Sequence, residues 1–314
     1  MSGAARHAVE QRGLRRIGYR LLPGSAFDYV LHMRPREWPI MIAHTSLGFF
    51  LARGISAGVT GAEVEALVAG LLVWVLMLNG GTLALNSAFD RDEGDIGYLD
   101  DPPPVPRHLA AWGFGLMLAG QVIALALPRG FALAYAGCFA MSLLYSVPPV
   151  RLKAVAGADW IINMIGFGTL TPYAGWALTR MPLTPAGAWA LAGFAPLFAA
   201  LYPLTQLYQL DEDRARGDRT LALALGARAS LALSVVAMLI AFACFAMAAR
   251  LAAHRIGNAR AFIALAAATA VWLAVLLPWL ARAPRMLPRA HKRGMYAALA
   301  AWAVTDVAVL LSTT

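Results

Sequence analysis

Charged residues are scarce in this chain. Only 14% of its 314 residues are Asp, Glu, Lys or Arg, whereas 60% are hydrophobic. Soluble globular domains are about 25% charged and about 45–50% apolar, so the sequence lacks the polar residues that would cover a cytosolic protein. The mean hydropathy of +0.62 agrees with this reading. The composition therefore predicts an integral membrane protein.

Cysteine is also rare. Cys138 and Cys244 both lie in apolar runs, and neither has a second Cys or a His at metal-ligand spacing. This pattern argues against a disulfide framework and against a zinc site. The first 36 residues are polar and rich in Arg, and they contain no apolar core ahead of a cleavage site, so we expect no signal peptide.

Long apolar runs, in contrast, fill most of the sequence. About 20 mostly apolar residues cross a bilayer as a helix. We therefore expect an all-α integral membrane protein with nine transmembrane helices around a central cavity. Its organisation would be a basic N-terminal segment, 1–36, followed by one nine-helix domain, 37–314. The nine predicted spans are 37–55, 66–88, 109–127, 130–147, 159–178, 186–208, 229–249, 261–281 and 294–312.

The N-terminal segment allows two interpretations. Its arginines are interleaved with apolar residues, which suits an interfacial helix lying on anionic lipid, but a flexible basic tail has the same composition. The residues concerned are Arg12, Leu14, Arg15, Arg16, Ile17, Arg20 and Leu21.

The basic residues predict the orientation. With the N-terminus in the cytoplasm, the inner segments hold 20 of the 26 Lys and Arg residues and the outer segments hold six. Cytoplasmic loops of membrane proteins carry such an excess, so the net charge of +9 indicates topology and does not require nucleic acid as a partner. We expect a bacterial inner (plasma) membrane protein whose active site faces the cytoplasm.

The acidic residues show a second asymmetry. Ten of the 17 lie in two inner loops, one after the span 66–88 and one after the span 186–208. Orientation does not require this, because Asp and Glu contribute little to it, so we expect chemistry there. The ten are Asp90, Asp92, Glu93, Asp95, Asp100, Asp101, Asp211, Glu212, Asp213 and Asp218.

The first acidic loop follows a polar helix end. Asn86 and Asp90 are four residues apart and share a helix face, and Asp95 follows Gly94 in the loop. Oxygen ligands at this density suit Mg²⁺, which commonly binds one or two carboxylates together with substrate phosphates. A solvated acidic loop is the alternative. Asn86 favours the functional interpretation, because polar groups within an apolar span are costly.

Two more polar elements lie on the same side. Gln206, Gln209 and Asp213 are spaced to share one helix face, directly after the sixth span. Between the fourth and fifth spans, Arg151 and Lys153 follow two prolines. These cations are either membrane-surface anchors or the partners that a Mg²⁺-bridged diphosphate would need.

Taken in order, these motifs resemble the UbiA superfamily of intramembrane prenyltransferases. The resemblance covers roughly residues 34 to 312 and departs at three places. One is the Arg-Pro-Leu tract that usually follows the first acidic motif, which is replaced here by Asp100-Asp101-Pro-Pro-Pro-Val-Pro106-Arg107-His108. In the other two, Gly94 stands where the last acid of the first motif is usual, and Gln209 replaces the Asp that usually opens the last motif, for which Asp211 is the candidate substitute. The matching motifs are Arg34-Pro-x-x-Trp38, Asn86-x-x-x-Asp90-Arg-x-x-x-Asp95, Tyr145-Ser-x-Pro-Pro-x-Arg151-x-Lys153 and Asp213-x-x-x-Gly217-x-x-Thr220-Leu.

The resemblance implies a site and a cofactor. In this family, Mg²⁺ held by the two acidic motifs bridges an isoprenoid diphosphate, and the basic loop stabilises the leaving group. The implied metal ligands are Asn86, Asp90, Asp95, Asp211 and Asp213, and the implied catalytic residues are Asp90, Asp213 and Lys153. The implied diphosphate-binding residues are Asn86, Tyr145, Arg151, Lys153 and Gln209.

Three functions are consistent with the sequence. The first is Mg²⁺-dependent transfer of a prenyl group from a polyprenyl diphosphate to a lipophilic, aromatic acceptor within membrane lipid. The second is a terpene cyclase of the same superfamily, in which the substrate's own double bond captures the cation. The third is a lipid transporter or binding protein without enzymatic activity. Its path would need polar residues across the membrane, whereas the acidic clusters lie on one side only.

Two polar residues inside predicted spans are not part of these motifs. His44 lies in the first span and Asp306 in the last. An intramembrane ionisable residue is a candidate functional residue, although a hydrogen bond between helices would also account for either one.

Overall fold

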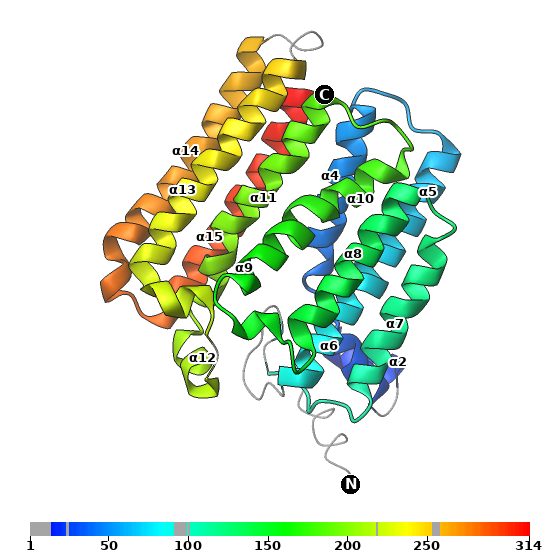
Figure 1. Ribbon diagram of the computed structural model, residues 1–314, viewed down its shortest axis with the longest axis vertical. Coiled ribbons are helices and arrows are strands. Elements are labelled where there is room, and N and C mark those ends of the chain that lie inside the picture. The colour runs from blue at the N-terminus through cyan, green and yellow to red at the C-terminus, as the bar shows by residue number, and fades with distance from the viewer. Residues whose placement is uncertain (1–13, 23–24, 91–98, 100, 218, 253–257) are drawn as a thin grey trace.

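The computed structural model describes residues 14–22, 25–90, 99, 101–217, 219–252 and 258–314, and most of these are helical (Figure 1). Two short helices come first, and they fall within the segment predicted to be interfacial; whether they lie on lipid stays a prediction. The helices of the first part of the chain are α2 (Leu14–Leu21), α3 (Ala26–His32), α4 (Trp38–Arg53), α5 (Gly61–Leu71), η1 (Leu72–Asn79), α6 (Gly80–Asp90), α7 (Leu109–Ala124) and α8 (Arg129–Ser146).

The second part of the chain continues in the same way. The π-helical segments η1 and η3 join their flanking α-helices without a break, and the left-handed backbone of Gly226 (φ 76°) interrupts α13. The elements are η2 (Leu152–Ala154), α9 (Ala158–Asn163), η3 (Met164–Leu170), α10 (Thr171–Leu178), α11 (Pro185–Gln206), α12 (Leu210–Arg216), α13 (Leu221–Ala252), α14 (Asn258–Arg282), η4 (Ala283–Arg285) and α15 (Pro288–Thr313).

Each predicted span lies largely within such helical segments, but some helices are longer than hydropathy indicates. The last helix begins at Pro288 rather than 294, because the basic residues of its first turns are unfavourable in lipid but compatible with a helix. Among the described residues, five helical segments are long and apolar enough to cross a membrane: 61–90, 185–206, 221–252, 259–282 and 288–313. The chain is thus an all-helical integral membrane protein, and the count of nine spans remains a prediction.

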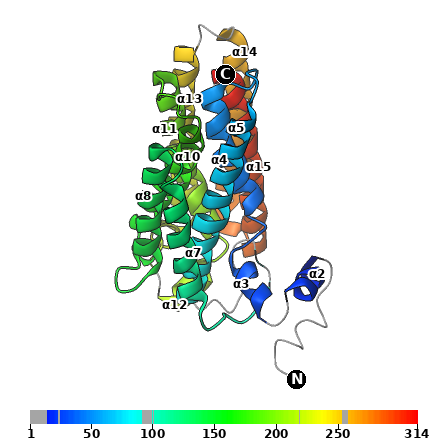
Figure 2. The ribbon, with the colours of Figure 1, turned by 90° about the vertical axis from the view of Figure 1, so that its right-hand side faces the viewer.

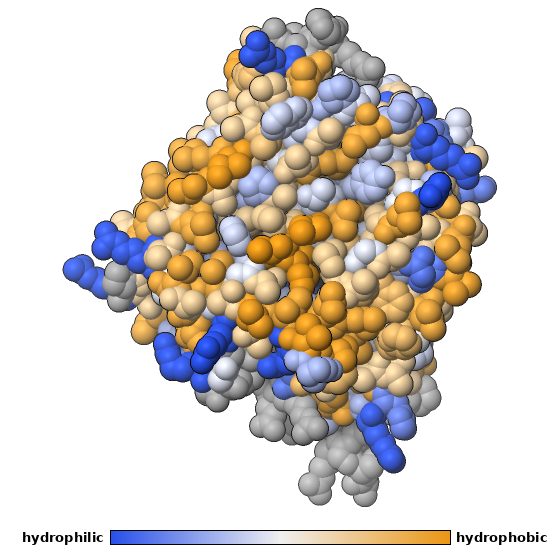
Figure 3. Space-filling model, in the orientation of Figure 1, coloured by the Kyte–Doolittle hydropathy of each residue, from blue (hydrophilic) through white to orange (hydrophobic). Residues whose placement is uncertain are grey.

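Two large hydrophobic cores divide the helices into halves. One core joins α11, α13, α14 and α15, and the other joins α4, η1, α6, α7, α8 and α10. In Figure 1 the first group lies on the left and the second on the right. Apolar side chains cover most of the middle of the face in Figure 3.

Close contact between α4 and α10 depends on two glycines. A Cβ atom at Gly48 would lie 1.6 Å from the carbonyl oxygen of Pro172, and one at Gly175 would lie 1.8 Å from that of Thr45. Neither helix could therefore carry a larger residue at these positions without moving apart. Tight backbone approach through small residues is a common way in which helices pack in membranes.

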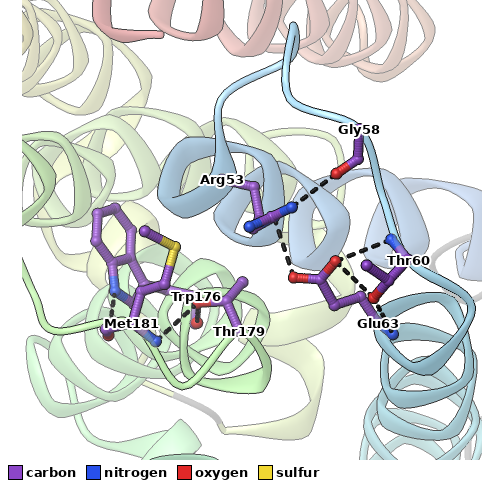
Figure 4. A network of polar contacts seen from close by, with 7 residues as sticks. All are labelled: Arg53, Gly58, Thr60, Glu63, Trp176, Thr179 and Met181. Atoms are coloured by element: carbon purple, nitrogen blue, oxygen red, sulfur yellow. Dashed lines mark hydrogen bonds and ion pairs between the residues drawn. The ribbon is translucent and has the colours of Figure 1, made fainter.

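The two ends of the bundle differ. At one end of the bundle lie the end of α6 and the helices α2, α3 and α12, at the bottom of Figures 1 and 2; we call this the site end. At the other end, Arg53 closes α4 against the start of α5 (Figure 4). Its Nε lies 3.1 Å from Glu63, which also forms a capping box with Thr60.

Candidate functional site

A cavity of about 600 Å³ lies between the two halves. It extends along the continuous helix 61–90 from Trp74 to Asp90, which corresponds to roughly 24 Å of helix axis. One end is polar and coincides with the site end of the bundle, whereas the walls beyond it are mainly apolar and aromatic. Of the predicted site residues, those that line the cavity are Asn86, Asp90, Tyr145, Lys153, Gln209 and Asp213.

The first acidic motif and the basic loop meet at this polar end. Lys153 Nζ donates to Asn86 Oδ1 at 2.7 Å and to Asp90 Oδ1. Arg151 Nη2 reaches the same Asp90 oxygen at 3.2 Å. The last turn of α6 places Asn86 and Asp90 one above the other, as their four-residue spacing predicts. Two cations therefore neutralise one partly buried carboxylate beside the cavity.

The backbone of Arg151 is part of this arrangement. Arg151 has a φ of 36°, in the left-handed region, which costs a non-glycine residue about 1–2 kcal/mol. Arg151 lies two residues after the second proline of this loop. Its left-handed conformation opens the short 3₁₀ segment η2, which carries Lys153 toward α6. The loop therefore holds the lysine inward, which an anchor at the membrane surface would not require.

A tyrosine pair forms the boundary between the polar end and the apolar walls. Tyr145 and Tyr202 share a hydrogen bond of 2.8 Å between their hydroxyl oxygens. Phe198 stacks on Tyr202, with ring centroids 6.2 Å apart, and on Phe167 at 5.2 Å. The lining of the cavity thus changes at Tyr202 from hydrogen-bonding groups to aromatic rings.

The second acidic motif lies across the cavity from the first. Asp213 of α12 is only 4% exposed, and its Oδ2 accepts a hydrogen bond of 3.4 Å from Thr220. Gln209 and Asp213 both line the cavity, as does Gln206 at the end of α11. The motif's carboxylate is therefore buried beside the polar end, although α6 and α12 belong to different halves.

Asp159 is a buried polar residue that the sequence did not single out. Its Oδ2 accepts from Gln206 Nε2 at 2.9 Å and from the Leu221 amide at 3.2 Å, and its Oδ1 accepts from the Gly157 amide at 2.9 Å. Gln206 Oε1 in turn accepts from the Ala222 amide at 3.2 Å. This carboxylate ties the start of α9 to the end of α11 and the start of α13. The only sequence signal was an acid in the first turn of a helix.

Two predicted metal ligands do not join the cluster in the described residues. Asp211 points to solvent with its side chain 86% exposed and pairs with Arg214 at 2.9 Å, so the structure gives no support to Asp211 as the substitute for the acid missing at Gln209. Asp95 lies outside the described residues.

The donor set at the polar end fits a magnesium ion. Asn86, Asp90, Gln209 and Asp213 supply amide and carboxylate oxygens around one end of one cavity. Among the described residues no three His, Cys, Asp or Glu side chains cluster as a complete metal site. Mg²⁺ commonly binds through one or two carboxylates and completes its shell with substrate phosphates and water, so a phosphate-bearing ligand would be needed as well.

Both π-helical segments contribute to the cavity wall. Trp74 and Asn79 of η1 and Phe167 of η3 line it. A π-helical turn shifts the register of the side chains that follow it, and such turns occur frequently at functional sites. The sequence carried no signal for them, because hydropathy does not distinguish an α-helix from a π-helix.

Comparison with known sequences identifies relatives. The sequence model of the UbiA prenyltransferase family matches residues 41–302. The chain is also similar to digeranylgeranylglyceryl phosphate synthase of Methanothrix thermoacetophila, with 30% identity over 203 residues that cover 59% of this chain and 70% of the relative.

Comparison with solved structures identifies the fold. A UbiA homologue from Archaeoglobus fulgidus bound to DMAPP and Mg²⁺ matches with a TM-score of 0.67 at 20% identity, covering 89% of this chain and 99% of that one. A UbiA homologue from Aeropyrum pernix K1 matches with a TM-score of 0.61 at 18% identity, covering 89% and 98%.

Proposed function

Because the chain belongs to the UbiA prenyltransferase family, we propose that it transfers a prenyl group from a prenyl diphosphate to a lipophilic acceptor in a Mg²⁺-dependent reaction. The observation that carries the proposal is the meeting of Asn86, Asp90 and Lys153 at the polar end of an apolar cavity. A prenyl diphosphate has the matching form, with an anionic head on a hydrocarbon tail. The A. fulgidus homologue, which was solved bound to DMAPP and Mg²⁺, supports the proposed use of both ligands.

The residues of this chain would act on the leaving diphosphate. Asn86, Asp90 and Asp213 would hold the metal, which supplies positive charge to the phosphate oxygens when bound. Lys153 and Arg151 would contact the diphosphate and stabilise the negative charge that develops as the C–O bond breaks. Gln209 and Tyr145 line the same end and would orient the head group. Asp211 is excluded from our proposed ligand set because its side chain is exposed and outside the cavity.

The apolar part of the cavity would bind the prenyl chain. Its aromatic faces, among them Phe167, Phe198 and Tyr202, suit a hydrocarbon tail and keep water away from the allylic cation. Desolvation strengthens the electrostatic interactions at the polar end. The acceptor attacks C1 of the cation and then loses a proton, which completes the transfer.

We further propose the topology that the sequence predicts. The nine helical spans would cross a bacterial inner membrane with the N-terminus and the site end in the cytoplasm. The positions of the basic residues support this orientation, because 20 of 26 fall on that side. The variants Asp101→Cys and Gly58→Cys test it when each is labelled in intact cells with a membrane-impermeant thiol reagent. We expect the second site to react and the first to be protected.

Release of diphosphate tests the catalytic proposal. Purified protein in detergent should release diphosphate from labelled geranyl diphosphate with Mg²⁺ and should not do so after chelation with EDTA. The Asp90→Asn variant should lose at least about 100-fold in rate. Glu65→Gln is the matched control, because Glu65 is exposed on α5 and outside the cavity. Equal rates with and without Mg²⁺ would overturn the proposal.

Product analysis then identifies the acceptor class. A transferase needs a lipid extract to form product, whereas a cyclase forms product from the diphosphate alone. A prenylated aromatic product would support the acceptor predicted from the sequence. A prenylated glyceryl phosphate would instead match the reaction named for the M. thermoacetophila relative.

A further inference from the structure

A pair of polar residues lies in the apolar part of the cavity, away from the diphosphate end. His44 of α4 and Asp306 of α15 both line the cavity, and His44 Nδ1 lies 3.8 Å from Asp306 Oδ1. The fold brings them together from its first and last long helices. His44 is only 4% exposed. The proposed reaction at the polar end uses neither residue.

The pair has unused hydrogen-bonding capacity. The backbone carbonyls of Phe167 and Gly168 lie near the His44 ring, and Trp302 lies against the Asp306 carboxyl group. Within the described residues, however, three atoms have no partner in hydrogen-bonding geometry: both ring nitrogens of His44 and Oδ1 of Asp306. Buried polar groups are normally paired, because each unpaired one costs about 1–3 kcal/mol. These groups therefore face a space in which a polar ligand atom would be stabilising.

The geometry suits a single bridging oxygen. A separation of 3.8 Å is too long for a direct hydrogen bond. An oxygen about 2.8 Å from both atoms could donate to the carboxyl group of Asp306 and accept from a ring N–H of His44. Phe194 and Trp302 hold the His44 ring edge-to-face, with centroids 5.0 and 5.1 Å away, so the ring's orientation is fixed before a ligand arrives.

The prenyl donor cannot supply that oxygen. All the polar atoms of a prenyl diphosphate are in its head group, which the site end accommodates, and the rest of the molecule is hydrocarbon. The second substrate of the proposed transfer is therefore the ligand that can satisfy the pair. We propose that His44 and Asp306 form a subsite that binds a hydroxyl oxygen of the lipophilic acceptor. This inference rests on the proposed function in naming the acceptor as the ligand.

Two probes that differ by one oxygen test the subsite. The dissociation constants of 4-nonylphenol and nonylbenzene are measured from the ligand-dependent rise in unfolding temperature of the purified protein. The wild type should bind the phenol about tenfold more tightly, which is the size expected from hydrogen bonds to a buried polar pair. His44→Phe and Asp306→Leu should bind the two probes equally.

Matched variants keep the test decisive. Thr269→Val removes another intramembrane hydroxyl, one that bonds only its own helix at Leu265 and does not line the cavity, and it should keep the tenfold preference. Asp306→Asn retains an acceptor oxygen and should keep part of the preference if the other variants fold poorly. No preference in the wild type, or full preference in His44→Phe, would overturn the proposal.

The donor provides the separate readout. Binding of geranyl diphosphate with Mg²⁺ should be unchanged in His44→Phe and Asp306→Leu. If these variants also lose donor binding while remaining folded, the pair acts on the donor and the acceptor subsite is refuted. If the wild type fails to bind geranyl diphosphate at all, the proposed function fails, whatever the probes show.

Discussion

Replacement of Asp159 by Ala tests the structural support of the second acidic motif. The Asp159 side chain is fully buried and accepts three hydrogen bonds, from the amides of Gly157 and Leu221 and from the side chain of Gln206. The change removes the acceptor and leaves all three donors in place. It therefore tests whether this carboxylate holds the ends of α9, α11 and α13 together.

The magnitude follows from those three donors. Each buried donor left without a partner costs about 1–3 kcal/mol, but water entering the space vacated by the side chain would recover part of this. We expect Asp159→Ala to lower the free energy of unfolding by about 3 kcal/mol. Asp159→Asn keeps the volume but turns an N–H toward a donor, so its effect should be smaller, at about 1–2 kcal/mol.

Unfolding in detergent, followed by circular dichroism, measures the effect. Asp211→Ala is the comparison, because that carboxylate is exposed and its pair with Arg214 is of a kind that contributes little, about 0–1 kcal/mol. A second readout is diphosphate release, which should fall in Asp159→Ala because Gln206 loses one of its two fixed partners. If Asp159→Ala unfolds no more easily than Asp211→Ala, the three-helix tie is refuted.

Three further predictions concern other parts of the chain. Lys153→Met should lower diphosphate release about 100-fold and Lys153→Arg should retain more of it, as assayed with labelled geranyl diphosphate. Burial lowers the pKa of His32 from 6.5 to about 4, so protonation favours the unfolded chain. Stability should be complete above pH 6.5 and fall toward pH 4, with a flatter unfolding profile in His32→Gln. Gly175→Ala should destabilise by about 1–3 kcal/mol, because its Cβ would lie 1.8 Å from the Thr45 carbonyl oxygen, whereas Gly115→Ala, in open space, should not.

The sequence predicted the parts of this protein that depend on local spacing. Asn86 and Asp90 share a helix face because they are four residues apart, and hydropathy located the helices to within a few residues at most ends. The longer extents of α13 and α15 were missed because charged or polar turns at helix ends interrupt hydropathy without interrupting the helix. Asp90 and Asp213 line one cavity, which agrees with the expectation from hydropathy and charge that the two acidic motifs lie on one side.

The parts that the sequence did not predict depend on contacts between distant residues. Asp159 gains its role from partners 47 and 62 residues away. His44 and Asp306 each stood out as polar groups in a span, but only the packing of α4 against α15 shows that they face one another. Asp211 was a reasonable substitute for a missing acid by position, but the turn of α12 directs it to solvent and Asp213 inward.

A double-mutant cycle tests the central claim that the two acidic motifs serve one site. Diphosphate release is measured for the wild type, Asp90→Asn, Asp213→Asn and the double variant under identical Mg²⁺ and geranyl diphosphate concentrations. If both carboxylates act on one metal-bridged diphosphate, each single change costs about 100-fold and the double change costs little more, because residues that act as a unit are not additive. A shared site would be contradicted if the loss of rate in the double variant equals the product of the two single losses. Full activity in either single variant would contradict it as well.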